Sequence, residues 1–355
     1  MEDTFVRPRM DLLAMTPEKE EAPSKHSLEE GEGTVWSSLK KTIAIITTTS
    51  VVLLAMRNTA TYHLQHFWGA SGNFWQHQWD KILDLFGHDD FNLFVYGPVI
   101  VSYIVYWGVG SLFILLDLTS LHTFTKKYKM QPNTNEPLLL REVLKTFVVV
   151  SFNQIFIGIP SVVPAYWFLQ VRGYDRSPHL PTFHWVLFEL VICIIAIEFG
   201  FYYAHRLIHH RSLYKHIHKI HHEWQSPIAI SALYVHPAEY ILATVVPIML
   251  GPIILGSHPA TLFLWCALAT MNTLNAHCGY HLPFFPSPEA HDYHHLKFNQ
   301  CYGVLGILDH LHGTNKNFRA SVNYPRHQTF LTMTPPRKMF PDVEPDAKAI
   351  KGKSC

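Results

Sequence analysis

Charged side chains are scarce in this chain, and no two cysteines have the spacing of a zinc or redox motif. Aspartate, glutamate, lysine and arginine make up only 15% of the 355 residues, about as much as the 14% that are aromatic. A water-soluble domain needs more charge to cover its surface, so the composition favours a membrane protein. A net charge of +1 without a basic stripe excludes nucleic-acid binding, and five cysteines without a CxxC pair exclude a disulfide framework.

Long apolar runs predict an all-α membrane protein with about four transmembrane helices. The runs are residues 42–56, 91–118, 147–171 and 185–203. Pro160 and Pro164 predict a bend in the third run, because proline removes a backbone donor. The fifth run, residues 240–271, is interrupted by prolines and Gly256, and this pattern predicts a re-entrant helical hairpin.

These runs divide the chain into four regions. We expect a disordered cytosolic tail at residues 1–34, transmembrane helices at 35–200, a histidine-motif catalytic region at 201–320 that includes the hairpin at 240–271, and a C-terminal cytosolic tail at 321–355.

The distribution of basic residues predicts the orientation. Residues 119–145 carry five lysines and arginines, whereas residues 58–90 carry one lysine and four aspartates. The positive-inside rule therefore places residues 119–145, the histidine region and both termini in the cytosol. The last five residues, beginning with Lys351, resemble a KxKxx retrieval signal and indicate the endoplasmic reticulum membrane.

Histidine is the abundant residue, and it is clustered. Of 25 histidines, 16 lie between His205 and His312. Four motifs have the spacing of ligands on one helical face: a pair, a triplet, a pair and a triplet. The ten candidate metal ligands are His205, His209, His218, His221, His222, His277, His281, His291, His294 and His295.

Ten imidazoles exceed what one metal ion binds, because a single zinc or iron takes four to six ligands. The motifs therefore predict a dinuclear metal site in a helical cap. Neutral imidazole suits zinc, copper, iron or nickel, so these residues alone leave the metal open.

Residues 205–314 resemble the fatty acid hydroxylase/sterol desaturase superfamily. The resemblance rests on HRLIHH, HKIHHEWQSP, HPAE at His236, HCGYHLP, HDYHH and LDHLHGT. Within the superfamily, the chain is most similar to methylsterol monooxygenases and to the group of fatty acid hydroxylase domain-containing protein 2. The resemblance implies two iron ions (zinc being possible in purified protein), dioxygen, and electrons from NAD(P)H through cytochrome b5 and its reductase.

Three residues are expected to support the site. Glu198 lies two helical turns before His205 and is expected either to hydrogen-bond a ligand's second nitrogen or to be an inward membrane carboxylate paired with an arginine or a tyrosine. His236, in the HPAE element, is expected to support a ligand or to begin a helix. His281 stands where methylsterol monooxygenases often have aspartate, so it is either a ligand or a neighbour of the site.

The resemblance implies a lipid substrate, with hydroxylation of a sterol methyl group as the first hypothesis. Two alternatives stay open: a fatty-acid or sphingolipid hydroxylase, and a metal-stabilised membrane scaffold or lipid sensor without turnover. We expect the cavity lining to include Trp224, Trp265 and Phe284.

Overall fold

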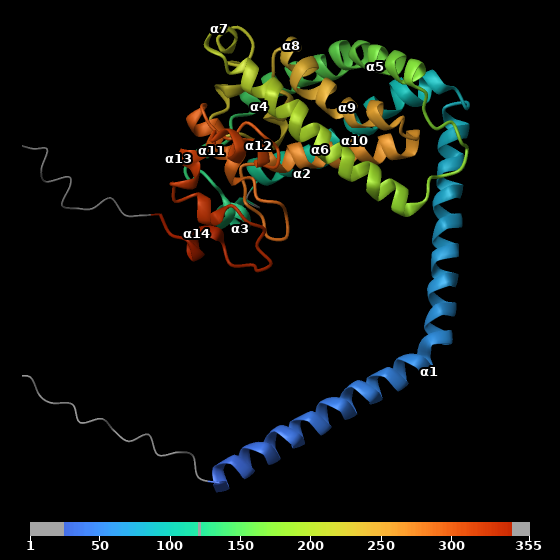
Figure 1. Cartoon of the computed structure of the whole chain (residues 1–355). Coiled ribbons are helices and arrows are strands. Elements are labelled where there is room, and N and C mark those ends of the chain that lie inside the picture. The colour runs from blue at the N-terminus through green and yellow to red at the C-terminus, as the bar shows by residue number, and fades with distance from the viewer. Residues whose placement is uncertain (1–24, 120–121, 343–355) are drawn as a thin grey trace, which may run out of the picture. The chain divides into compact units, whose positions relative to one another are not determined.

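The computed structural model describes residues 25–119 and 122–342, and within these residues there is no β-strand. A single isolated bridge joins Lys129 and Tyr280. Most of the predicted N-terminal tail, up to residue 24, and the retrieval-like C-terminal ending lie outside the described residues, whereas residues 25–34 are helical. The all-helical prediction is confirmed (Figure 1).

The chain divides into two units, residues up to Phe74 and residues from Trp75 onward. The helix α1 (Lys25–Leu85) contributes to both. In the first unit, Trp36–Arg57 is long and apolar enough to cross a membrane, and its apolar side chains are exposed. This segment contains the first predicted span.

The second unit contains four more helices of this kind, so the chain is a multi-pass membrane protein. The first is Asn92–Leu118, which contains α2 (Gly97–Leu118), and the second is Leu140–Arg172, which contains α4 (Leu140–Phe152), η3 and α5 (Ile159–Arg172). The third is α6 (Phe183–Ile208), and the fourth is Pro237–Leu255, which contains α8, η6 and α9. Their positions confirm the three remaining predicted spans and the first arm of the hairpin.

The second arm of the hairpin is α10 (Pro259–His277). Gly256 ends α9 (Val246–Leu255) in the left-handed conformation, with φ of 66°, and so reverses the chain. The guanidinium of Arg172, the last residue of α5, donates to the carbonyl of Ile254. The tip of the hairpin therefore lies beside the end of α5. The helix α10 runs back from this tip and ends at His277, in the third histidine motif.

Small residues let α6 and α9 approach closely. A Cβ atom at Gly251 would lie 2.7 Å from the Cα of Cys193, and one at Gly200 would lie 3.2 Å from the Cα of Pro247. Close backbone contact of this kind stabilises helix pairs in lipid, where the hydrophobic effect does not drive association.

Three π-helical segments interrupt the long helices, and each ends two residues before a proline. They are η1 (Asn92–Tyr96) before Pro98, η3 (Asn153–Gly158) before Pro160, and η6 (Tyr240–Val245) before Pro247. Proline lacks an N–H and its ring clashes with the carbonyl four residues earlier, and the wider π turn is the local response. In the third span, the π segment η3 before Pro160 changes the helical register.

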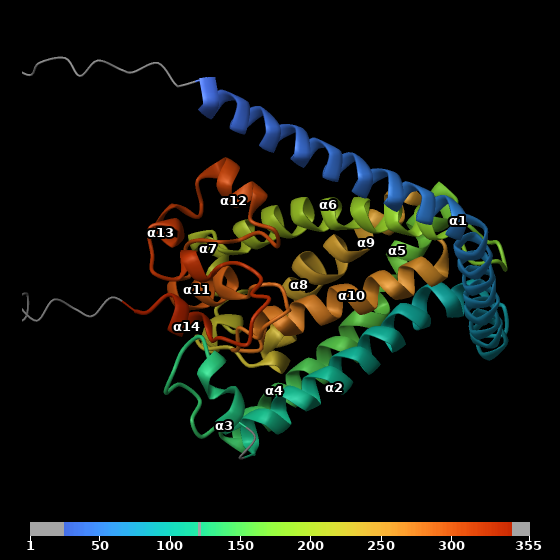
Figure 2. The same cartoon turned by 90° about the horizontal axis from the view of Figure 1, so that it is seen from below.

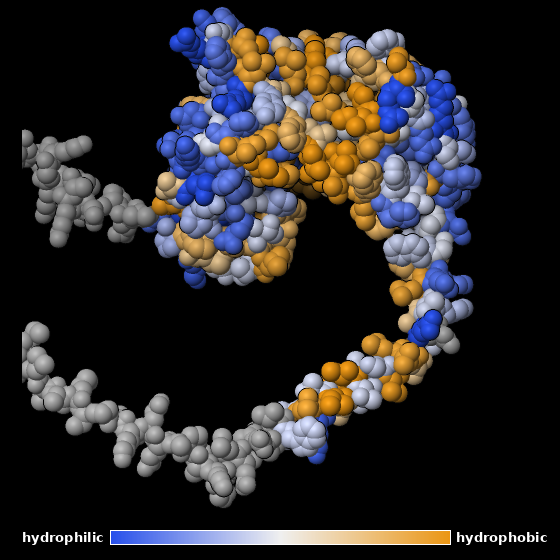
Figure 3. Space-filling model, viewed as in Figure 1, coloured by the Kyte–Doolittle hydropathy of each residue, from blue (hydrophilic) through white to orange (hydrophobic). Residues whose placement is uncertain are grey.

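The histidine motifs lie at one end of the second unit. There the ends of α6 and α10 meet the short helices α11 (Glu289–Lys297), α12 (Ile307–His312), α13 (Lys316–Arg319) and α14 (Pro336–Met339) (Figure 2). Apolar surface covers the region of α5, α6 and α9, whereas hydrophilic surface gathers around α7 (Arg211–Tyr214) (Figure 3). The chain thus separates a lipid-compatible bundle from a polar cap.

Candidate metal centre

Nine of the ten predicted histidine ligands converge in two groups. The first histidine group contains His205, His209, His218, His222 and His294. The second histidine group contains His221, His277, His291 and His295. Within each group, the potential ligand nitrogens lie within 4.8 Å of one another. The prediction of two metal sites rather than one agrees with this geometry.

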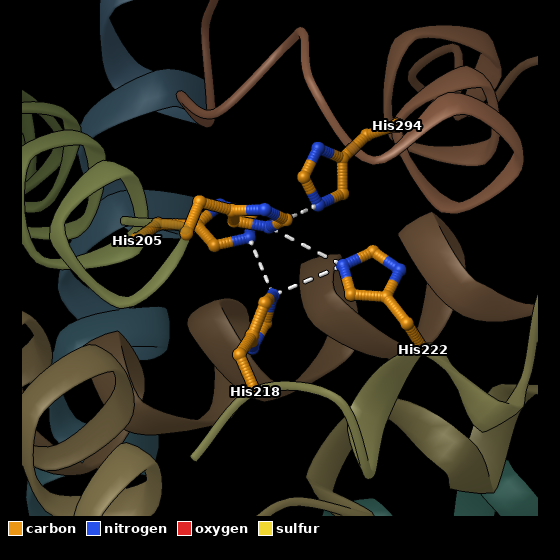
Figure 4. Close-up of side chains that lie close together, drawn as sticks. His205, His218, His222 and His294 are labelled. Carbon is orange, nitrogen blue, oxygen red and sulfur yellow. Dashed lines mark hydrogen bonds between the residues drawn. The ribbon is translucent and has the colours of Figure 1, made fainter. Parts of the chain in front are cut away.

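The first histidine group joins α6, the turn after α7, and α11. The Nε2 of His218 lies 3.2 Å from that of His205 and 3.0 Å from that of His222. The Nε2 of His209 lies 3.3 Å from His222 and 3.1 Å from His294. Figure 4 shows the rings of His205, His218, His222 and His294 pointing toward a common centre.

The second histidine group joins η4 (His221–Glu223), α10 and α11. The Nε2 of His277 lies 2.9 Å from that of His291 and 3.3 Å from that of His221. The Nε2 of His295 lies 3.2 Å from that of His291. Four imidazole nitrogens therefore face one point here as well.

The Nδ1 atoms of four ligands donate to backbone carbonyls, which can only accept. His205 donates to Tyr302 at 2.9 Å and His294 to Gln300 at 2.7 Å. His277 donates to Thr273 at 2.8 Å and His295 to Trp224 at 2.9 Å. A neutral ring that carries its proton on Nδ1 presents a lone pair at Nε2, as a metal ligand must.

The separations between neighbouring nitrogens fit a bound ion. Imidazoles that bind an ion at about 2.1 Å place neighbouring nitrogens about 3.0 Å apart at octahedral angles and about 3.4 Å apart at tetrahedral angles. The observed separations, from 2.9 to 3.3 Å, lie in this range. An all-nitrogen set fits iron, and it also fits zinc or copper.

Each triplet divides between the two groups. The outer histidines, four residues apart, stay together: His218 and His222 in the first group, His291 and His295 in the second. The middle histidine of each triplet crosses to the other group: His221 joins the second and His294 the first. The three histidines of a triplet therefore do not all contribute to one group, although their spacing places them on one face of a regular helix. In the first triplet the cause is local, because turns and the 3₁₀ segment η4 replace a regular α-helix.

His281 belongs to neither group. Its Nδ1 lies 3.1 Å from the Glu289 carboxylate, and its Nε2 lies 3.1 Å from the Gln328 carbonyl. The α10 helix ends at His277, so the spacing of four no longer returns to the same face. His281 is buried and holds α11 against the segment after residue 320, and the structure places it as a neighbour of the site.

Glu198 lies near His205, but its carboxylate binds backbone amides. It accepts hydrogen bonds from the N–H groups of Val304, Leu305 and Leu308. Asp309 accepts from the N–H groups of Tyr302 and Gly303. The two acids hold a loop whose Tyr302 carbonyl accepts from His205, so Glu198 supports this ligand through the loop and not through the expected direct hydrogen bond.

His236 begins a helix, which is one of the two roles expected for it. It is exposed, and its Nδ1 accepts from the N–H of Ala238 at the start of α8 (Pro237–Glu239). The residue of the HPAE element that contacts a candidate ligand is instead Glu239, which sequence reasoning missed. Its buried carboxylate lies 2.7 Å from the Nδ1 of His218. An acid at the start of an apolar run was the available signal.

Replacing Glu239 with leucine should weaken metal binding to the first histidine group by about 10- to 100-fold, because a carboxylate beside Nδ1 orients the ring and raises its basicity. Metal content after dialysis against graded chelator should fall toward one ion per chain. Glu239→Gln, which keeps an acceptor, should bind better than Glu239→Leu, and His236→Ala is the matched control. Unchanged metal content in Glu239→Leu would disprove the role of this carboxylate.

Burial keeps the histidines neutral. It lowers the pKa of His277 to about 4, and the hydrogen bond to the Thr273 carbonyl opposes the shift only in part. The pKa values of His218, His221, His291, His294 and His295 lie well below the usual range, first through burial and then through repulsion from neighbouring histidines. Neutral imidazoles are the metal-binding form, so the groups are ready to bind at neutral pH.

A cavity of about 500 Å³ runs from the histidines into the helical bundle. His205, His218, His221, His277 and His291 form one part of its wall. Apolar residues of α2, α6, η6, α9 and α10 form most of the rest, and its volume is typical of small-molecule sites. Of the three predicted lining residues, Trp265 lines the cavity, whereas Trp224 is buried outside its wall and Phe284 is exposed.

The comparisons with known proteins agree with this site. A model of the fatty acid hydroxylase family matches residues 190–314. Human fatty acid hydroxylase domain-containing protein 2 is 45% identical over 311 residues, which cover 88% of this chain and 93% of that protein. Methylsterol monooxygenase 2-2 of Arabidopsis thaliana is 31% identical over 65% of this chain and 88% of its own length. A very-long-chain aldehyde decarbonylase of Oryza sativa is 32% identical over 54% of this chain and 76% of its own length. No solved structure matches the chain significantly.

Proposed function

Since the chain belongs to the fatty acid hydroxylase family, we propose that it is a membrane monooxygenase that uses two iron ions and dioxygen to hydroxylate a lipid, with a C4-methyl group of a sterol as the reacting carbon. The observation that carries the proposal is the opening of both histidine groups onto one apolar cavity. The methylsterol monooxygenases among the relatives favour a sterol.

The chain's own residues would hold the ions, orient the substrate and exclude water. Iron bound by the two groups supplies the reduction of dioxygen and the oxidation of an unactivated C–H bond. The carbonyls of Tyr302, Gln300, Thr273 and Trp224 keep a proton on the Nδ1 of four ligands. The apolar wall keeps water away from the reacting carbon.

The charge of the cap supports the proposal of an acidic electron donor. Arg206, Arg211, Lys215 and Lys219 are exposed, and residues 203–222 contain no aspartate or glutamate. Such a face attracts an acidic protein and orients it beside the first histidine group. We therefore assign delivery of electrons from NAD(P)H to cytochrome b5 and its reductase, with the cap in the cytosol and the helices in the endoplasmic reticulum membrane.

Lipidomics of cells that lack the protein tests this function. C4-methylsterols should accumulate, because their methyl group is no longer oxidised. Wild type should restore normal levels, and a His221→Ala, His222→Ala double variant, which removes one ligand from each group, should not. An exposed His210→Ala, His216→Ala double variant is the control and should restore them.

Two results would contradict the proposal. Altered 2-hydroxylated acyl chains with normal sterols would identify a fatty-acid or sphingolipid hydroxylase. Two zinc ions in protein expressed with ample iron, with no oxygen-dependent product, would identify a metal-stabilised scaffold or lipid sensor.

A further inference from the structure

The wall of the cavity includes a buried amide group that the metal chemistry does not use. Gln154, on η3, is only 4% exposed and lines the cavity. Its Oε1 accepts a hydrogen bond of 2.8 Å from the indole Nε1 of Trp107. Because an indole N–H can only donate, this contact fixes the amide orientation and turns the NH₂ group away from Trp107. No described residue accepts a hydrogen bond from that NH₂ group.

A buried phenol lines the same cavity. Tyr240, the first residue of η6, is 8% exposed, and no described residue hydrogen-bonds to its hydroxyl. This hydroxyl lies 3.1 Å from the Cβ position that a larger side chain would have at Gly158. Gly158 lies four residues after Gln154, about one turn along η3. The segments η3 and η6 contact each other, so the Tyr240 hydroxyl lies about one turn from Gln154 along η3.

The neighbouring asparagine differs in how its NH₂ group is used. The Asn153 side chain donates to the carbonyls of Leu233 and Val235 at 3.3 and 2.8 Å and joins η3 to the loop at η5 (Ala229–Leu233). Asn153 therefore has a structural partner for its NH₂ group, whereas Gln154 has none for its own. A buried polar group without a partner is costly in an apolar surrounding, so an unused donor facing a cavity indicates a polar ligand atom.

The backbone around these residues also indicates a ligand site. Gln154 and Tyr240 both lie on π-helical segments, which occur frequently at functional sites. Tyr240 directly follows Glu239, whose carboxylate contacts His218. The phenol and the histidines therefore face one cavity, and a single lipid molecule can contact both.

We propose that Gln154 and Tyr240 form a second binding site within the substrate cavity, in which the Gln154 NH₂ group and the Tyr240 hydroxyl donate hydrogen bonds to the hydroxyl oxygen of a sterol alcohol. This inference rests on the proposed sterol function. The two side chains anchor the polar oxygen, and this contact fixes which carbon of the ring system lies at the histidine groups. They select and orient the substrate and take no part in its oxidation.

Binding of matched lipids to the full chain in detergent micelles tests this site. The probes are tritiated lanostanol and its hydrocarbon lanostane, with octadecanol and octadecane as a second pair. Wild type should bind the alcohol about tenfold more tightly than the hydrocarbon, the effect of a good buried hydrogen bond. In Gln154→Leu and in Tyr240→Phe, the ratio of the two dissociation constants should fall toward one, with two metal ions still bound.

Two controls separate recognition from folding. Gln170→Leu replaces an exposed glutamine on the same continuous helix and should keep the wild-type ratio. Trp107→Phe removes the donor that orients Gln154 and should lower the ratio, although it does not touch the NH₂ group. Because Tyr240→Phe keeps the ring in place, it remains informative if Gln154→Leu fails to fold.

The outcomes distinguish this site from the proposed function. A wild-type ratio in both Tyr240→Phe and metal-loaded Gln154→Leu would overturn the site. If the two variants lowered the ratio for octadecanol and octadecane but not for lanostanol and lanostane, the sterol specificity of the site would be disproved. If the two variants lowered the ratio for lanostanol and lanostane, but the wild-type protein formed no oxygen-dependent product, the site would be supported and the oxygenase function contradicted.

Discussion

Removing two ligands from the first histidine group should cost its metal ion, whereas removing the adjacent His221 and His222 should weaken both sites, the second more than the first. His222→Ala with His294→Ala removes two of five ligands from the first group and should leave about one ion, bound by the second. His221→Ala with His222→Ala removes one ligand from each group, and the second group then retains only three imidazoles. Elemental analysis of purified protein gives the ion count per chain. Both variants should lose product formation by more than about 100-fold, because the proposed oxygenase reaction requires both ions.

The same variants test the assignment of His221 and His294 to opposite groups. If the two triplets each served one metal, His222→Ala with His294→Ala would weaken both sites equally. His281→Ala is the matched control, because His281 comes from the same set of motifs but contacts Glu289 and Gln328 instead. It should keep two ions, and loss of an ion from this variant would contradict its placement outside the site.

Acidification should release both metals and destabilise the fold. The pKa of His277 is about 4 in the folded chain, below its usual value of 6.5, and burial lowers those of the other ligands in the cap in the same direction. The unfolded chain therefore binds more protons than the folded chain below about pH 6.5. The stabilising contribution is complete above pH 6.5 and is lost as the pH falls from there toward 4, by up to about 1.4 kcal/mol per pH unit for each histidine.

Metal content and the thermal unfolding midpoint, measured from pH 8 to pH 5, check this expectation. Protons compete with metal for the same nitrogens, so the metal-loaded protein should lose its ions over the acidic part of this range. Chelator-treated protein should show a lower midpoint at pH 5 than at pH 8 even without metal. A midpoint independent of pH in the metal-free protein would contradict the burial of neutral histidines.

The ligands could be predicted from the sequence because helical spacing is local. A spacing of four places two side chains on one face, and His205 with His209, His218 with His222, and His291 with His295 all remain together. Spacing alone does not determine which faces of different helices meet. The exchange of His221 and His294 depends on how η4 and α11 pack, and for this reason only the structure reveals it.

The supporting residues could be predicted less well, because their partners are distant in the sequence. Glu198 contacts amides about a hundred residues later, and Glu239 contacts His218 from another helix. The helical spans were predictable, since apolar runs of sufficient length have few alternatives in a membrane. Gln154 and Tyr240 could not be predicted as a pair that faces one cavity, because a glutamine and a tyrosine in apolar runs have no distinctive spacing.

The exchange of histidines between the triplets also dictates when the metals can bind during synthesis. The first group lacks His294, and the second has only His221, until α10 and α11 have left the ribosome. A nascent chain must therefore insert its earlier spans into the membrane with open, incomplete sites. A chain that stops before α11 should therefore lack the second site and keep four of the five imidazoles of the first.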